Sequence, residues 1–188
     1  MRVQEQGGQN LPMTPRRRAE MLKAEEQYLL DKARMNSETG VKEMLRSVDV
    51  LFQEIKRHCS DLGMSEIYCG IDSREANKFR MCAISTGQVS ISIVWNHQYD
   101  NDLEGAELTV RKIKGRLILP NDASPFVYRA TGFREISETT YRPDLSVERE
   151  YGWKRERPTD FKSSPVLAEY LVMQLMELAS RNAQGLLR

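Results

Sequence analysis

The sequence predicts an α+β fold: an N-terminal helix pair, an antiparallel meander sheet of five to seven strands, and a C-terminal helix packed on the sheet. Three observations predict it. Apolar residues recur at steps of three and four as far as residue 62, and from residue 65 they alternate with polar residues. A further helical segment opens after residue 163. Strand hairpins follow one another without helices between them, which argues against a doubly wound parallel sheet.

The length and composition suit one domain of ordinary size. The chain has 188 residues, of which 40% are hydrophobic, and we expect a mobile tail over 1–13 followed by a single domain over 14–188. Lys and Arg total 28 against 27 Asp and Glu, which gives a net charge of +1. The whole molecule therefore has no electrostatic attraction for nucleic acid, although a local basic patch is not excluded.

The protein is predicted to be cytoplasmic. Its apolar runs are far shorter than the roughly 20 residues that span a bilayer, so we expect no membrane partner. Three cysteines without a Cys-x-x-Cys pair suit a reducing compartment in which each thiol packs in the core.

Two helices are predicted before the sheet. Thr14-Pro15 is typical of a helix start, and the helix over about 15–35 carries a thin apolar stripe that Glu26 interrupts. Ser37 or Thr39 can cap the second helix, which ends at Gly63. Its apolar face is wide, so it must lie along a core. That face consists of Val41, Met44, Leu45, Val48, Leu51, Phe52, Ile55, Cys59 and Leu62.

The sheet is predicted from residue alternation. A hairpin centred on Thr86-Gly87 places one set of apolar residues on a common face: Cys82, Ile84, Val89, Ile91, Ile93 and Trp95. A second hairpin is predicted at Lys114-Gly115, with Leu108, Val110, Leu117 and Leu119 on one face and Arg111, Ile113, Arg116 and Ile118 on the other. Further strands are expected at 126–130, 134–142 and 147–154, joined at 142–146, and their many charges place them at a sheet edge.

Ser163-Ser164-Pro165 opens the last helix, in which only Glu169, Gln174 and Glu177 interrupt the apolar residues from 166 to 179. Such a helix must be covered twice, either by the sheet and the second helix of its own chain or by the sheet and another subunit. The second alternative assigns an oligomer interface to Leu167, Tyr170, Leu171, Met173 and Leu178.

The loop from Asn96 to Glu107 concentrates polar side chains. It begins like a calcium-binding loop, but Arg111 stands where a glutamate would complete the ligand shell, so we predict a solvated loop without metal. No glycine-rich phosphate motif is present, and no cofactor is expected. A ligand or partner surface is predicted at Trp95, His97, Tyr99, Asp100, Arg111 and Trp153.

These features favour a non-enzymatic protein-interaction or ligand-binding module that forms homodimers, with a second copy or another protein as partner. Two alternatives remain open. One is a small enzyme with a pocket on the open sheet face around His97 and Asp100. The other is nucleic-acid binding through Arg16–Arg18 and the predicted 111–116 hairpin.

Overall fold

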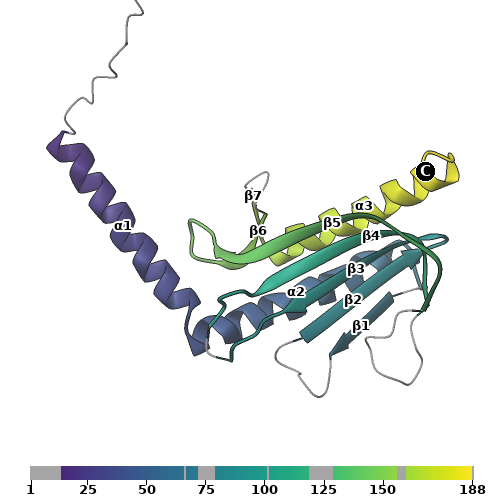
Figure 1. Cartoon of the computed structure of the whole chain (residues 1–188), viewed down its shortest axis with the longest axis horizontal. Coiled ribbons are helices and arrows are strands. Elements are labelled where there is room, and N and C mark those ends of the chain that lie inside the picture. Colours follow the sequence, from purple (N-terminus) through teal and green to yellow (C-terminus); the bar gives the residue numbers. More distant parts are fainter. Residues whose placement is uncertain are drawn as a thin grey trace, which may run out of the picture. The chain divides into compact units, whose positions relative to one another are not determined.

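The computed structural model describes residues 14–65, 67–71, 79–100, 102–118, 129–155 and 160–187. Its elements, in chain order, are α1 (Pro15–Met35), α2 (Glu38–Asp61), β1 (Ile67–Ile71), β2 (Phe79–Thr86), β3 (Val89–Asn96), β4 (Glu107–Ile118), β5 (Arg129–Leu145), β6 (Tyr151–Arg155), β7 (Asp160–Lys162) and α3 (Ser164–Ala183) (Figure 1). The predicted α+β fold, with two N-terminal helices, an antiparallel sheet and a C-terminal helix, is confirmed. The tail predicted over 1–13 lies outside the described residues.

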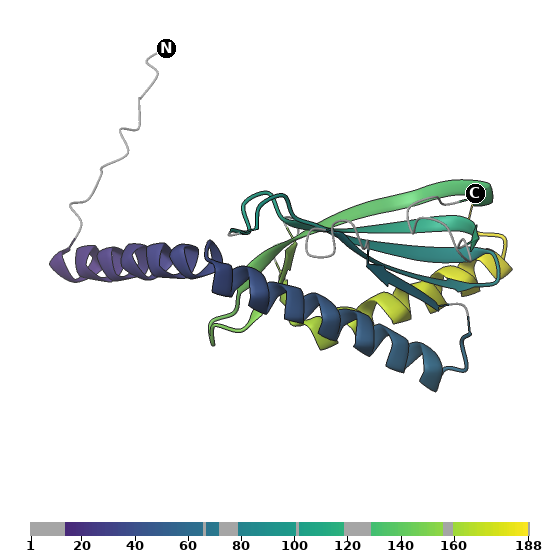
Figure 2. The same ribbon diagram turned by 90° about the horizontal axis from the view of Figure 1, so that it is seen from below.

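The sheet is a seven-stranded meander in which β1 to β7 pair in chain order and every pair is antiparallel. Helices α2 and α3 pack against each other and cover the same face of this sheet (Figure 2). Antiparallel neighbours need no crossover connection, so each strand lies beside its predecessor in the chain.

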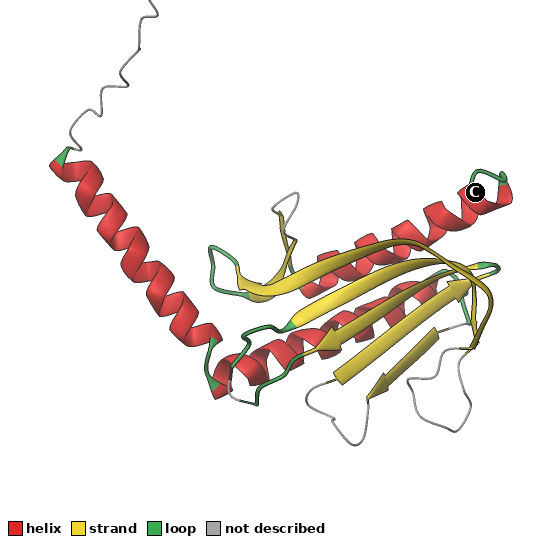
Figure 3. Ribbon diagram, viewed as in Figure 1, coloured by secondary structure: helices red, strands yellow, loops and turns green. Residues whose placement is uncertain are grey.

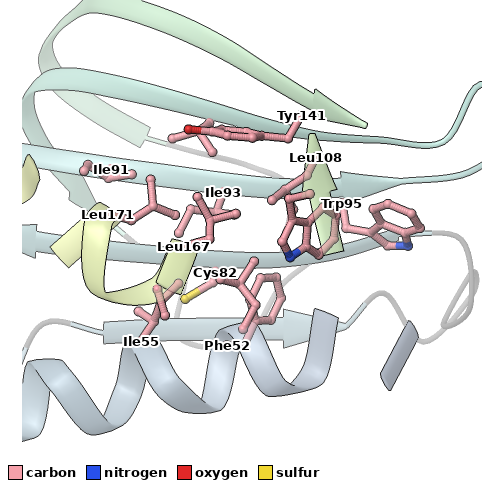
Figure 4. Close-up of a cluster of buried hydrophobic side chains, with 14 of the residues drawn as sticks. Phe52, Ile55, Cys82, Ile91, Ile93, Trp95, Leu108, Tyr141, Leu167 and Leu171 are labelled. Atoms are coloured by element: carbon pink, nitrogen blue, oxygen red, sulfur yellow. The ribbon is translucent and has the colours of Figure 1, made fainter. Parts of the chain in front are cut away.

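The main core lies between the sheet and the two helices. The six residues predicted to share a face of the first hairpin are all fully buried there, among them Cys82, Ile93 and Trp95. Phe52 and Ile55 of α2 and Leu167 and Leu171 of α3 approach this face from the helical layer (Figure 4). The opposite face of the sheet carries a smaller buried cluster of Met81, Ala83 and Ile113.

The ends of α2 confirm the sequence prediction. The Ser37 side chain accepts a hydrogen bond from the Gly40 N–H at 3.0 Å, and this satisfies a donor that the first helical turn leaves unpaired. Just past the other end, Gly63 has a φ of 69°, which favours glycine. Ser163 occupies the corresponding position before α3, although its side chain makes no capping hydrogen bond.

The hairpin predicted at Lys114-Gly115 is wrong. Strand β4 runs without interruption through these residues (Figure 3), and its pairing with β5 shifts register between Lys114 and Arg116. Gly115 has a φ of 123° and its N–H donates to the Gln88 carbonyl at 2.7 Å, beside the turn that joins β2 and β3. The positive φ therefore forms a β-bulge beside the start of β3, and the chain does not reverse.

The later strands also differ from prediction. Residues 129–145 form one strand, β5, and its connection to β6 lies at 146–150 instead of 142–146. Because β6 pairs only with Tyr141–Leu145, the stretch 134–140 of β5 has β4 on one side and no described strand on the other. The charged residues of this stretch therefore lie at a sheet edge, as the sequence predicts.

Contacts divide the chain into two compact units, one up to Arg34 and the other from Met35 to Arg188. The sequence predicts one domain over 14–188, whereas these contacts leave most of α1 outside the unit that carries the sheet. Helix α1 begins and ends where the sequence places it, and it has no buried residue.

Candidate functional site

Three of the six residues predicted to form a ligand surface lie together inside the core. Trp95 and Trp153 meet edge to face with ring centroids 5.6 Å apart, and the His97 ring stacks on Trp95 at 5.9 Å. All three side chains are buried, His97 with 1% exposure. They therefore stabilise the interior of the protein and are closed to a partner.

A buried hydrogen-bond chain fixes this cluster to both helices. The Trp153 Nε1–H donates to the Ser164 hydroxyl at 3.0 Å, and that hydroxyl donates to the Ser47 carbonyl of α2 at 2.7 Å. One serine thus satisfies an indole donor from β6 and links α3 to α2.

The other three predicted surface residues are exposed but lie apart from this cluster. Tyr99 and Asp100 belong to the loop between β3 and β4. Arg111 pairs with Ser92 in the β3–β4 register, next to core residues, so its side chain projects from the face opposite the helices. There its Nε lies 2.6 Å from a Glu138 carboxylate oxygen. The six residues therefore form no common site.

The loop between β3 and β4 makes contacts of its own. A carboxylate oxygen of Asp102 accepts the Glu104 N–H at 2.8 Å, and two apolar residues of the same loop, Leu103 and Ala106, are buried. Among the residues that the structure describes, no three His, Cys, Asp or Glu side chains gather closely enough to hold a metal ion.

Three cations of the predicted basic run, Arg111, Lys112 and Lys114, are divided between the two faces of the sheet. Lys112 Nζ donates to the Gln174 side chain of α3, and Lys114 Nζ donates to the Leu187 carbonyl at 2.6 Å. Desolvation by burial lowers the pKa of Lys112, with the Glu177 charge opposing that shift. Because Arg111 points the other way, these cations form no continuous patch for a phosphate backbone.

Helix α1 carries more of the large exposed apolar side chains than any other described element. Met21, Leu22, Tyr28, Leu29 and Leu30 are each between 54% and 64% exposed. Leu22 and Leu29 are seven residues apart and share one side of the helix with three further apolar residues. We call this side the α1 seam: Ala19, Leu22, Leu29, Leu30 and Ala33.

Helix α3 carries a second exposed apolar stripe. Val166, Met173 and Met176 are 51%, 63% and 43% exposed, and half-buried Tyr170 lies among them with Lys162 Nζ 5.1 Å from its ring centroid. We call these four residues the α3 stripe. Exposed Glu169 and Glu177 lie on the same side of the helix.

The predicted oligomer interface is therefore only partly at the surface. Tyr170 and Met173 belong to the α3 stripe, but Leu167, Leu171 and Leu178 are buried against the sheet and α2 of their own chain. Helix α3 is thus covered by the sheet and by α2 of its own chain, which is the first of the two alternatives that the sequence offers. The interface prediction omitted Val166 and Met176, which helical spacing from Met173 would have placed beside it.

No protein-family model, curated protein or solved structure matches this chain. None of the described helices combines the length and apolar character that crossing a bilayer requires.

Proposed function

We propose that this protein is a non-enzymatic interaction module that forms a homodimer, with α1 as its binding element. The observation that carries this proposal is a 21-residue helix with no buried residue, in which the three leucines of the α1 seam, Leu22, Leu29 and Leu30, are each more than half exposed. An apolar cluster of this kind typically marks a surface that another molecule covers.

The energetics of α1 also favour a partner. Most helical stability in proteins comes from the packing of an apolar face, and α1 has no buried residue. The first turn of α1 has no acidic residue, and Arg16, Arg17 and Arg18 lie near the positive end of the helix dipole. The ion pair between Arg16 and Glu20 is largely exposed and contributes little. Association would supply the missing packing energy.

The geometry favours this role over the two alternatives. A pocket around His97 and Asp100 would need both side chains in one cavity, yet His97 is enclosed in the core and Asp100 lies in an exposed loop. Nucleic-acid binding would need the cations of this run together, yet Arg111 projects from the sheet face opposite to that of Lys112. Arg16–Arg18 remain exposed, but a short basic run at one helix end is a small footprint.

Sedimentation equilibrium of the full chain at micromolar concentration tests the proposal. We expect a dimer, and Leu22→Gln with Leu29→Gln should raise its dissociation constant at least about tenfold. Burial of each leucine contributes about 1.5–3 kcal/mol, and about 1.4 kcal/mol corresponds to tenfold. The matched control is Met21→Gln with Tyr28→Gln, which changes two exposed apolar residues seven positions apart on the opposite side of the same helix. A wild-type chain that stays monomeric would refute the proposed function.

A further inference from the structure

We propose that the α1 seam of one copy docks on the α3 stripe of the second copy, and that the exchange is reciprocal. This inference rests on the proposed homodimer and names the surface that receives α1. In a twofold dimer each chain would donate one helix and accept one, so the same contact would form twice.

The two surfaces match in spacing. Leu22 and Leu29 in the α1 seam are seven residues apart, and so are Val166 and Met173 in the α3 stripe. At about 1.5 Å of rise per residue, each pair spans about 10 Å, so the projecting side chains of one helix fall between those of the other. Methionine adds to this fit because its flexible side chain adapts to an irregular partner.

The charges of the two surfaces are complementary. Exposed Arg18 and Lys23 flank the α1 seam, and exposed Glu169 and Glu177 lie among the residues of the α3 stripe. Opposite charges around an apolar centre steer association and fix the orientation of the two helices.

Pairing of α1 with a second α1 is less favourable, because Glu26 lies within the seam. A parallel pair that aligns the leucines brings Glu26 beside Glu26 of the second copy. An antiparallel pair with Leu22 opposite Leu29 brings it beside Glu25. Both arrangements place carboxylates together in an apolar contact.

The α3 stripe offers Glu26 a counterion. Lys162 Nζ lies 5.1 Å from the Tyr170 ring centroid, and Tyr170 follows Val166 by four residues, as Glu26 follows Leu22. When Leu22 and Leu29 align with Val166 and Met173, Glu26 therefore lies near Lys162. The interruption that weakens an α1–α1 pair thus becomes a charged contact on α3.

A complementation experiment tests the inference with two variants of the full chain. The first carries Leu22→Gln and Leu29→Gln, and the second carries Val166→Gln and Met173→Gln. Both pairs of sites are exposed, so the fold should persist. Each variant alone should lose dimer affinity at least about tenfold relative to wild type. Gln53→Ala on the exposed side of α2 is the control and should leave the dimer unchanged.

Mixing the two variants gives the decisive reading by sedimentation or by fluorescence anisotropy of one labelled chain. The intact α1 of the second variant can dock on the intact α3 of the first, so a heterodimer should form where neither variant pairs alone. Its affinity should be lower than that of wild type because one of two contacts remains.

The outcomes separate this inference from the proposed function. If the α1 variant dissociates while the α3 variant stays dimeric, α1 is the binding element but its receiving surface lies elsewhere. If both dissociate and the mixture forms no heterodimer, the reciprocal exchange is refuted while the proposed function stands. A wild-type chain that stays monomeric refutes the proposed function, and the inference with it.

Discussion

Helices α1 and α2 follow one another in the chain and have similar lengths of 21 and 24 residues, yet α2 buries eight residues and α1 buries none. The difference lies in the width of the apolar face. In α2, apolar residues continue turn after turn from Val41 to Cys59, whereas Glu26 divides those of α1. A continuous face supplies enough buried area to hold a helix on a sheet, and a divided one does not.

The helix ends reinforce this contrast. Helix α2 has Ser37 as its N-cap and Glu38 in its first turn, which both stabilise the positive end of the dipole. Helix α1 has arginines there instead. Its own unit therefore offers it neither packing nor favourable end charges, and this is why we assign it to an interface.

The largest expected effect is at the core of α2. Leu51→Ala should lower the free energy of unfolding by about 2–5 kcal/mol, because the residue is fully buried among the sheet and both helices. Urea unfolding at a concentration below the dimer dissociation constant measures it. Leu22→Ala is the matched substitution on α1, and below the dimer dissociation constant it should change the free energy of unfolding by less than about 0.5 kcal/mol. An equal loss in both variants would mean that α1 packs within its own chain.

The link between the helices is the next target. Ser164→Ala should cost about 1–3 kcal/mol, since it leaves the buried Trp153 Nε1–H without its acceptor. Equilibrium unfolding followed by tryptophan fluorescence measures the loss. Ser60→Ala, at the exposed end of α2, is the control and should be close to neutral. If Ser164→Ala were equally neutral, the hydrogen-bond chain would add nothing to the packing of the two helices.

Tyrosines provide a pH test of the same contrast. Burial raises the pKa of Tyr141 to about 12, so above the unfolded value of 10.0 the unfolded chain loses a proton that the folded chain retains. Stability should therefore be intact below that value and fall by about 1–2 kcal/mol as the pH rises toward the folded pKa. Tyr141→Phe should flatten this decline in urea titrations. Tyr28→Phe on α1 should not, because Tyr28 is 64% exposed.

Local patterns predicted most of the fold. The limits of α1 and α2 and the core face of β2 and β3 follow from periodicity, which each segment carries by itself. The Lys114-Gly115 prediction failed because a glycine with positive φ fits a turn and a bulge equally well, and the decision depends on β5, a distant strand.

The candidate site was harder to predict for the same reason. Leu167 and Met173 are equally apolar in sequence, and only the position of α2 decides which of them remains at the surface. Likewise, Trp95 and Arg111 are both plausible surface residues until the strand register places them on opposite faces. Local residue propensity determines where helices and strands form, whereas the exposure of a side chain depends on contacts between segments far apart in the chain.

The smallest effect concerns the start of α1. Arg17→Glu should stabilise the helix by about 0.3–1 kcal/mol, because it replaces a cation with an anion at the positive end of the dipole. Hydrogen exchange of the α1 amides, measured in the dilute monomer, should slow accordingly. Lys32→Glu in the last turn reverses the sign and should speed exchange. If both substitutions left the exchange rates of the α1 amides unchanged while the dimer affinity shifted, the arginines would act on the partner and not on the helix. The difference between α1 and α2 would then depend on packing alone.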